Sequence, residues 1–340
     1  MTKIYLIRHA EAEGNVYRRL HGQYDSKITP NGAKQVTALQ KRFESVPIDA
    51  VYASDLTRTC ITAAAIYKPK GLELQRDARF REVNVGIWED RPFGQLEREE
   101  AARMHAFSHE PYAWSVEGCE TFPVYTGRFL EALDELAARH KGQTIAIFSH
   151  GMVLRGVLMR LFHPDARTAP ISHCENTGVT CITWDDGKYT LDFMNDASHL
   201  PQEISTLGRQ NWWRGGQKHD FNMWYRPAGA DDAALLATLG AVPAAGDEKL
   251  IAMLGDAPIG MVQLRELSAD TGGIVHLALL PERRGSGFGA QLIGCAVSRL
   301  RKCGKQYIEL LTLPQDTPAK ALFCNYGFEK KRTYIVPIVE

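Results

Sequence analysis

The first two thirds of the chain alternate short apolar, β-branched runs with segments whose apolar residues recur at helical spacing. The runs predict strands over residues 3–7, 50–53 and 144–148. The helical spacing predicts helices over residues 30–43, 56–66, 120–140 and 152–162, the first with Thr29 as N-cap and Pro30 at its first position. Strands that alternate with helices predict a mostly parallel sheet covered on both faces, a three-layer α/β/α architecture.

The pattern changes twice further along the chain. Residues 179–184 and 189–193 flank the turn sequence Asp185-Asp186-Gly187 and predict an antiparallel hairpin. After a small-residue stretch at 228–246, a fresh series of elements begins. It comprises strands over residues 249–254, 259–265, 274–280 and 307–312, a helix over 291–301, and a closing short helix and strand. We therefore expect two domains: an α/β domain at residues 1–219 and a smaller α+β domain with a mixed sheet at residues 220–340.

Composition agrees with two ordinary globular domains. The chain has 340 residues, 44% of them hydrophobic and 24% charged, and its 40 basic and 40 acidic residues cancel. A general affinity for nucleic acid or for an anionic membrane would need a basic surplus, so neither partner is expected. No apolar run approaches ~20 residues, and the seven cysteines form no Cys-x-x-Cys pair. These features predict a cytoplasmic protein without disulfides.

Charged residues follow several of the predicted strands. Arg8 and His9 end the first strand, Arg58 comes one helical turn after the second, Glu82 follows a third extended stretch, and His150 ends the strand at 144–148. The carboxyl ends of parallel strands meet at one sheet edge. Two guanidiniums there can grip a phosphate, a neutral imidazole can attack phosphorus, and a carboxylic acid can protonate the leaving alcohol.

These residues stand in a wider pattern of motifs. It runs Arg-His-Ala-Glu-Ala-Glu-Gly-Asn at 8–15, Ser-Asp-Leu-Thr-Arg-Thr-Cys at 54–60, Arg-Glu at 81–82, Gly-Ile-Trp-Glu at 86–89 and Ser-His-Gly at 149–151. The pattern resembles the histidine phosphatase (phosphoglycerate mutase-like) superfamily over residues 1 to about 200. The resemblance implies a metal-independent phosphohistidine mechanism and gives each residue a role: His9 nucleophile, Glu82 proton donor, Arg8, Arg58 and His150 phosphate pocket, and Asn15 a phosphate contact. Asp90 and Thr121 depart from it, since glycine and serine are usual there.

The segment at 83–119 bears on the choice between hydrolysis and phosphate transfer. It would cap the pocket, it is short, and it lacks the extra basic residues of the superfamily's mutases, so hydrolysis of a small phosphomonoester is favoured and a mutase is the alternative. Its apolar and aromatic residues suggest an organic leaving group, as in the compact α-ribazole and sugar-phosphate phosphatases that the domain resembles. His105 and His109 could share a metal, but no third ligand is nearby, so no metal is expected.

A glycine-rich turn at 281–290 follows a predicted strand and opens a helix. Glycines let the backbone approach an anion, and the helix start adds free N–H groups. With Tyr326-Gly327-Phe328 near the end, this turn resembles the acetyl-CoA pyrophosphate loop of GNAT acetyltransferases. The resemblance implies acetyl-CoA as co-substrate. The residues that would bind it are Leu279, Leu280, Arg284, Gly285, Ser286, Gly287, Phe288, Gly289 and Ala290.

The second domain also departs from the family that it resembles. Phe323 stands where a tyrosine usually protonates the leaving thiolate, Tyr326 lies three residues on, and His276 is either a base or an ordinary strand histidine. Acetylation of an unidentified amine is therefore one reading, and a CoA-binding module without catalysis is the other. We expect the two domains to pack directly, with Trp212, Trp213 and Trp224 as anchors.

Overall fold

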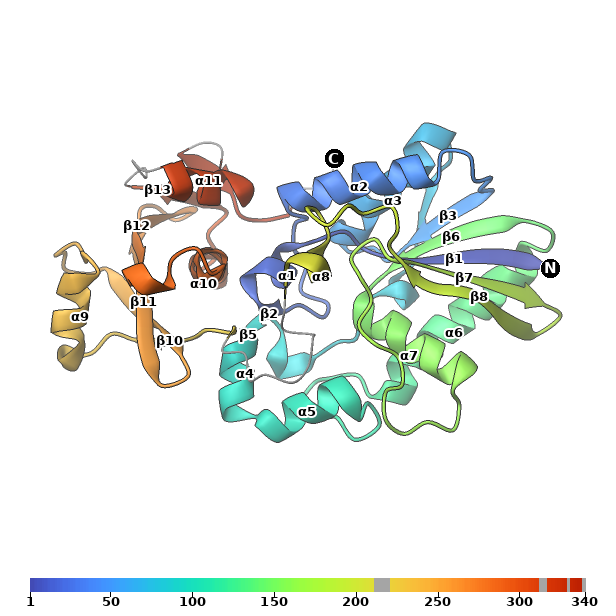
Figure 1. Ribbon diagram of the computed structural model, residues 1–340, viewed down its shortest axis with the longest axis horizontal. Helices are drawn as coiled ribbons and strands as arrows, with labels where there is room; N and C mark the ends of the chain where they lie inside the picture. Colours follow the sequence, from blue (N-terminus) through green and yellow to red (C-terminus); the bar gives the residue numbers. More distant parts are fainter. Residues whose placement is uncertain (211–220, 312–316, 329–330, 338–340) are drawn as a thin grey trace.

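The structure is a computed structural model that describes residues 1–210, 221–311, 317–328 and 331–337. Two six-stranded sheets form its two halves, each with its own helices (Figure 1). The fold class predicted from the sequence is confirmed: a mostly parallel sheet in the first half and a mixed sheet in the second. Among the described residues, no helix is long and apolar enough to cross a membrane.

The first sheet has the strand order β4-β3-β6-β1-β7-β8. Strands β1 (Thr2–Arg8), β3 (Ala50–Ala53), β4 (Leu74–Arg76) and β6 (Thr144–Ser149) are parallel. The hairpin predicted at the edge is confirmed as β7 (Val179–Asp185) and β8 (Lys188–Asp196), which run antiparallel. Asp186 and Gly187 have φ of 46° and 89° in its turn, the left-handed backbone that a two-residue hairpin loop requires.

Helices cover both faces of this sheet. α2 (Pro30–Arg42) and α3 (Thr57–Lys70) lie on one face, and α6 (Phe122–Arg139) and α7 (Gly151–Phe162) lie on the other (Figure 1). Successive residues of β1 alternate between the two layers: Ile4 and Leu6 are buried with α6 and α7, whereas Ile7 is buried with α2 and α3. The predicted cap of α2 is confirmed, because the Thr29 hydroxyl accepts from the Gly32 N–H at 3.0 Å.

Short elements lie over the carboxyl ends of these strands. Two of them, α1 (Glu13–Tyr17) and β2 (Arg19–Leu20), follow β1. The cap at 83–119 adds β5 (Arg91–Pro92), which pairs with β2, and the helices α4 (Phe93–Glu99) and α5 (Ala101–His109). The 3-10 turns 78–80 and 86–88 connect this cap to the sheet, and α8 (Thr206–Arg209) follows β8. These short pieces place side chains above the strand ends.

The second sheet has the order β14-β13-β12-β11-β10-β9, with only β12 and β13 parallel among the described strands. Its strands are β9 (Trp224–Pro227), β10 (Glu248–Leu254), β11 (Ala257–Glu266), β12 (Thr271–Leu279), β13 (Tyr307–Leu310) and β14 (Arg332–Tyr334). Its helices are α9 (Ala233–Thr238), α10 (Phe288–Lys302) and α11 (Thr317–Asn325). α10 begins three residues earlier than its periodicity predicts, because Gly287 takes a left-handed backbone (φ 85°) at the N-cap.

The two halves pack directly through α1 and α10, which lie side by side in Figure 1. Val16 and Tyr17 belong to the same buried apolar cluster as Leu292 and Ile293 of α10. A Cβ at Gly294 would lie 2.4 Å from the Cβ of Tyr17, so the helices touch at a glycine. Direct packing of the two parts, predicted from the sequence, is therefore confirmed.

Polar contacts fix the same junction. Arg301 donates from both terminal nitrogens to Glu13, at 2.7 and 2.9 Å, and both side chains are about nine-tenths buried. Of the tryptophans predicted as anchors, Trp224 lies at the junction, with the Arg98 guanidinium 4.3 Å from its ring centroid. Trp212 and Trp213 lie outside the described residues.

Candidate active site

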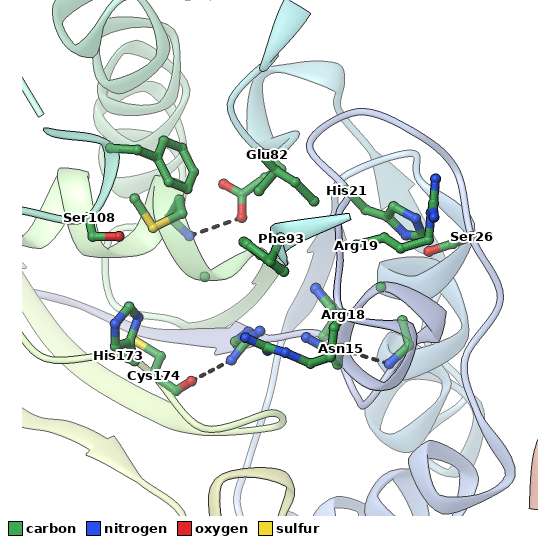
Figure 2. A pocket seen from close by; sticks show the side chains of 18 of the residues that line it. Asn15, Arg18, Arg19, His21, Ser26, Glu82, Phe93, Ser108, His173 and Cys174 are labelled. Carbon is green, nitrogen blue, oxygen red and sulfur yellow. Dashed lines mark hydrogen bonds between the residues drawn. The ribbon is translucent and has the colours of Figure 1, made fainter. Parts of the chain in front are cut away.

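A cavity of about 200 Å³ opens at the carboxyl ends of β1 and β6. Five residues predicted for the phosphatase site line it: Arg8, His9, Asn15, Arg58 and Glu82. They come from the end of β1, from α1, from α3 and from the loop after β4, so the sheet edge gathers them as the strand pattern predicts. Figure 2 shows Glu82 and Asn15 on opposite sides of this cavity, with Phe93 between them.

His9 is buried and held in one orientation. Its Nδ1 lies 2.7 Å from the carbonyl oxygen of Ala10, so Nδ1 carries the proton and Nε2 is the free lone pair of the neutral ring. Burial, followed by the positive charges of Arg58 and Arg8, lowers the pKa of His9 well below its ordinary value. A neutral imidazole with a defined lone pair is the form that can attack phosphorus.

Arg58 is fixed by three acceptors. Its terminal nitrogens donate to the carbonyls of Tyr24 (2.9 Å) and Gly22 (2.7 Å), and its Nε donates to His150 Nδ1 at 3.2 Å. His150 in turn donates from Nε2 to the Ser54 hydroxyl at 3.0 Å. His150 thus packs behind the pocket, 5.2 Å from the His9 ring, and supports Arg58 instead of lining the cavity.

Arg8 offers the clearest sign of an anion. Its Nη1 donates to the Cys174 carbonyl, a contact drawn in Figure 2. Its Nε is buried and has no hydrogen-bond partner among the described residues. A buried guanidinium donor without a partner is costly, and a ligand with an anionic oxygen would satisfy it.

Glu82 lies against the start of α7 and faces the cavity. Its carboxyl oxygens accept from the backbone N–H groups of Met152 at 2.9 Å and Val153 at 2.7 Å. Burial outweighs these bonds and raises the pKa of Glu82 above its ordinary value. A carboxyl group with a raised pKa that lines the same cavity as His9 is suited to proton donation.

The sequence patterns did not single out the rest of the lining. It includes Arg18, Arg19, His21, Ser26, Glu97, Ser108, Arg155, His173 and Cys174, most of them on loops and short elements. They carry no periodicity that would mark them. Phe93, Met104 and Phe107 of the cap also line the cavity and confirm the expected apolar wall.

The glycine-rich turn of the second half has a different construction. Gly285 and Gly287 have φ of 76° and 85°, residues 281–287 are exposed, and the chain then enters α10 with Phe288, Gly289 and Ala290 buried. The Arg284 Nε donates to the Leu279 carbonyl at 3.2 Å, which ties the turn to the end of β12. Exposed backbone therefore leads directly into a helix start, as the predicted anion loop requires.

The residues considered as acid or base of the second half, Tyr326 and His276, and Phe323 at the usual tyrosine position each contact other parts of the protein. Phe323 is buried against Phe328, with ring centroids 5.6 Å apart. Tyr326 faces Tyr17 of α1 at 6.1 Å, and burial raises its pKa to about 12. His276 Nε2 lies 2.7 Å from the Leu239 carbonyl. Phe323 thus has a packing role, and Tyr326 belongs to the junction.

The paired histidines of the cap lie apart from the pocket. His105 and His109 stack with centroids 4.6 Å apart on the exposed side of α5. Within the described ranges, no group of three or more His, Cys, Asp or Glu residues is placed to hold a metal ion.

Family models match both halves of the chain. The model described as "Histidine phosphatase superfamily (branch 1)" matches residues 4–197, more than half of the sequence. The chain belongs to the histidine phosphatase superfamily. The model of the acetyltransferase (GNAT) family matches residues 217–328, so a GNAT-family domain follows the histidine phosphatase domain.

Known relatives cover the histidine phosphatase domain. The chain is 27% identical over 200 residues to phosphoserine phosphatase 1 of Hydrogenobacter thermophilus, covering 59% of this chain and 95% of that protein. It is 31% identical over 207 residues to a metal-independent phosphoserine phosphatase of Arabidopsis thaliana, covering 59% and 84%. It is 30% identical over 206 residues to a probable phosphoglycerate mutase of Proteus mirabilis, covering 59% and 95%. Among solved structures, YhfR of Bacillus stearothermophilus matches with a TM-score of 0.56 and 31% identity, covering 58% of this chain and 99% of that one.

One departure from the histidine phosphatase pattern has a structural explanation. Asp90 has φ of 56°, a left-handed backbone that glycine adopts without strain, which accounts for the usual glycine there. Its carboxylate accepts from Arg19 Nε at 2.6 Å and lies 3.1 Å from His21 Nε2, and both partners line the pocket. It also accepts from the Ser298 hydroxyl of α10. Asp90 therefore links the pocket wall to the second domain.

Proposed function

We propose that this phosphoric monoester hydrolase, residues 1–219, cleaves a small organic phosphate through a phosphohistidine at His9. The observation that carries the proposal is the buried, unpartnered Nε of Arg8 beside the neutral ring of His9 and the guanidinium of Arg58. Two fixed guanidiniums match the charge spread over the phosphoryl oxygens, so the chemistry needs no metal.

The reaction has two steps. In the first, His9 Nε2 attacks phosphorus, an N–P bond forms, and the P–O bond to the alcohol breaks while the Glu82 carboxylic acid protonates the departing oxygen. In the second, water attacks the phosphohistidine and gives its proton to the Glu82 carboxylate. Phosphate leaves, and neutral His9 and protonated Glu82 are restored.

Hydrolysis is preferred over mutase activity because of the cap. Relatives with phosphatase names and with mutase names both match the chain. The cap places Phe93, Met104 and Phe107 against the cavity. Among the described residues, the segment at 83–119 adds no Lys or Arg to the lining, and its apolar side chains suit an organic alcohol better than a second phosphate group.

Phosphate release from a panel of phosphomonoesters, in the presence of EDTA, tests the proposal. We expect wild type to release phosphate and His9→Ala to lose at least ~1000-fold in rate, because no other group replaces the nucleophile. His105→Ala, on the exposed side of the cap, is the matched control and keeps its rate. Release that persists in His9→Ala, or transfer of phosphate within a substrate without free phosphate, would overturn the hydrolase mechanism.

The second domain, residues 220–340, is proposed to bind acetyl-CoA through residues 284–290, with Leu279 and Leu280 beside the pantetheine arm. The supporting observation is the pair of left-handed glycines that leads exposed backbone into α10. Transfer of the acetyl group to an amine is the family activity. Because Phe323 is packed in the core, a domain that binds CoA without catalysis is the second candidate. Titration with CoA measures binding, and a panel of amines with acetyl-CoA measures acetyl transfer. Binding with transfer supports the acetyltransferase, and binding without transfer supports the CoA-binding module.

A further inference from the structure

The turn at 284–290 leads directly into a residue that contacts the first residues of the second domain. Gln291 follows the turn near the start of α10, and its side chain is buried. Its Oε1 accepts from the Met223 N–H at 2.9 Å, and its Nε2 donates to the Phe221 carbonyl at 2.6 Å. One amide therefore holds the backbone on both sides of Asn222.

Asn222 joins this segment to the wall of the phosphatase pocket. Arg18 Nε donates to Asn222 Oδ1 at 2.9 Å, and Asn222 Nδ2 donates to Glu97 Oε1 at 2.6 Å. Arg18 ends α1, Glu97 lies on α4, and both line the cavity that contains His9. Figure 2 shows Arg18 beside Asn15 at this cavity. An amide can make both contacts at once because it offers an acceptor and a donor on the same planar group.

The same segment is packed tightly against the cap. An added Cβ at Gly94 of α4 would lie 2.3 Å from the carbonyl oxygen of Asn222 and 2.5 Å from that of Met223. Contacts this close transmit a displacement instead of absorbing it. A shift of Gln291 is therefore expected to move both Asn222 and α4, which carries Glu97.

Arg18 is held in a conformation that its own backbone disfavours. Its φ of 55° and ψ of 50° are left-handed, which is unfavourable for a residue with a Cβ. Its carbonyl accepts from the Phe93 N–H at 2.9 Å, and its guanidinium lies 4.8 Å from the Phe93 ring centroid. Such a conformation persists only where the surrounding contacts determine it. The position of Arg18 in the pocket wall therefore depends on these contacts and on its bond to Asn222.

A second group of contacts further along α10 supports the same pocket. Ser298 donates to Asp90, whose carboxylate holds two residues of the pocket wall, and Arg301 pairs with Glu13 of α1. Helix α10 thus begins at the turn proposed to bind CoA and supports the phosphatase pocket along its 15 residues.

We propose that the two sites are linked through Gln291 and Asn222, so that CoA bound at the turn strengthens the binding of a phosphate ester in the phosphatase pocket. Asn222 is then a positioning residue of the phosphatase that the second domain supplies. The proposal rests on the ester hydrolysis and the CoA binding proposed above, and it adds the coupling between them. By linkage, an occupied pocket strengthens CoA binding by the same factor.

The coupling is positive because both ligands favour the same arrangement. Contacts to CoA would fix an exposed turn, whose glycines at 285 and 287 have open space around them, and with it the start of α10 that carries Gln291. An ester in the pocket needs Arg18 and Glu97 in place. The ligand that binds first orders these contacts, so the second ligand loses less conformational entropy when it binds.

Two equilibrium measurements on the chain with both domains test the linkage. Phenylphosphonate is the probe for the phosphatase pocket, because it carries a phosphoryl and an aromatic group and its P–C bond is not hydrolysed. Calorimetry gives the Kd of CoA without and with saturating phenylphosphonate. Inhibition of p-nitrophenyl phosphate hydrolysis gives the Ki of phenylphosphonate without and with saturating CoA. We expect both constants to fall about 5-fold or more, by equal factors.

Substitutions along the route should remove the coupling and leave binding in place. Asn222→Ala and Gln291→Ala should each bind both ligands with a coupling factor below about 2. Arg299→Ala is the matched control on the same helix, because it removes an ion pair with Glu248 (2.9 Å) inside the second domain, and it should keep the wild-type factor. The coupling factor is a ratio measured on folded protein, so a general loss of stability does not change it.

Each outcome bears on one level of the proposal. A factor below about 2 in wild type, with both ligands bound, would overturn the coupling. A weakening of CoA binding by phenylphosphonate would overturn it too, since it would mean that the 3′-phosphate of CoA competes for the phosphatase pocket. A factor that survives in both Asn222→Ala and Gln291→Ala, or that is lost in Arg299→Ala, would overturn the route. If wild type binds no CoA, or hydrolyses no phosphomonoester, the corresponding proposed function fails and the coupling fails with it.

Discussion

The chain contains two regions suited to anions, and they are built on opposite principles. In the phosphatase pocket, buried side chains carry the charge, and the Arg58 guanidinium is held by three hydrogen bonds. In the turn at 284–290, exposed backbone leads into α10, and the residues that shape it are glycines with left-handed φ. The first region uses fixed side-chain charge, and the second uses N–H groups whose direction depends on backbone conformation.

This difference follows from what each anion must undergo. Bond making and breaking at phosphorus needs charges and a proton donor that do not reorganise during the reaction. A bound pyrophosphate takes no part in the chemistry and needs only donors at the right spacing. Substitutions that remove a charged or proton-donating side chain should therefore damage the first region most. Substitutions of glycine that restrict the backbone conformation should damage the second region most.

Glu82→Gln should have the largest effect of the substitutions that test this comparison. Glutamine keeps the shape but cannot donate a proton, so the rate on an alkyl phosphate should fall about 100- to 10000-fold. The loss should be much smaller for p-nitrophenyl phosphate, whose leaving group needs little protonation. Equal losses for both esters, measured by steady-state kinetics, would show that Glu82 is not the acid.

The pH dependence of wild-type activity should also report Glu82 as the proton donor. The reactive form has neutral His9, whose pKa is lowered, and protonated Glu82, whose pKa is raised. The value of kcat/KM should therefore rise as the pH passes upward through the His9 pKa and fall as it passes through that of Glu82. Glu82→Gln should lose the alkaline limb and keep the acid limb.

Gly287→Val tests the backbone side of the comparison. The position has open space around it, so any loss comes from the left-handed φ of 85°, which a β-branched residue resists. We expect CoA affinity to fall about 10- to 100-fold in calorimetric titration. Gly304→Val is the matched control, because Gly304 has φ of 76° with open space at the other end of α10. If both variants lose affinity equally, the turn has no special role.

Ser298→Ala should have the smallest effect of these substitutions. Ser298 of α10 contacts Asp90 beside the phosphatase pocket, so this substitution tests the link between the two domains. It removes the hydroxyl that donates to Asp90 and leaves the bonds from Arg19 and His21 in place. We expect the free energy of unfolding to fall by about 1–2 kcal/mol in chemical denaturation, with phosphatase kcat/KM changed less than about 3-fold. A larger kinetic loss would mean that the pocket wall depends on this one contact.

The sequence predicted the phosphatase residues because the fold places them by a simple rule. His9, Arg58 and Glu82 follow strands of one parallel sheet, and strand ends meet regardless of loop details. The apolar periodicity places the start of α10 three residues after its observed start at Phe288. Periodicity carries no information on the left-handed backbone of Gly287, which caps the helix. The role of His150 in the pocket stays a prediction, and in this structure it lies behind Arg58.

No such rule predicts that Arg18, Glu97 and Asn222 lie together in the structure. They come from the end of a five-residue helix, from the cap and from the start of the second domain, and only tertiary packing brings them together. The sequence marks Asp90 only as a departure from the family pattern. Its contacts to Arg19 and Ser298 depend on how two domains meet, which local spacing does not encode.

We expect helix α1 to make the lifetime of phosphatase activity depend on the second domain. At five residues it is far below the length at which a helix persists alone, and it is packed by Val16 and Tyr17 against α10. Opening of the second domain would therefore remove the apolar contacts of this helix and leave it held by hydrogen bonds within the first domain, such as that from Asn176 Nδ2 to Asn15 Oδ1. The amide hydrogens of α1 should exchange with solvent at the opening rate of the second domain, and heat inactivation of the phosphatase should follow the melting of its neighbour.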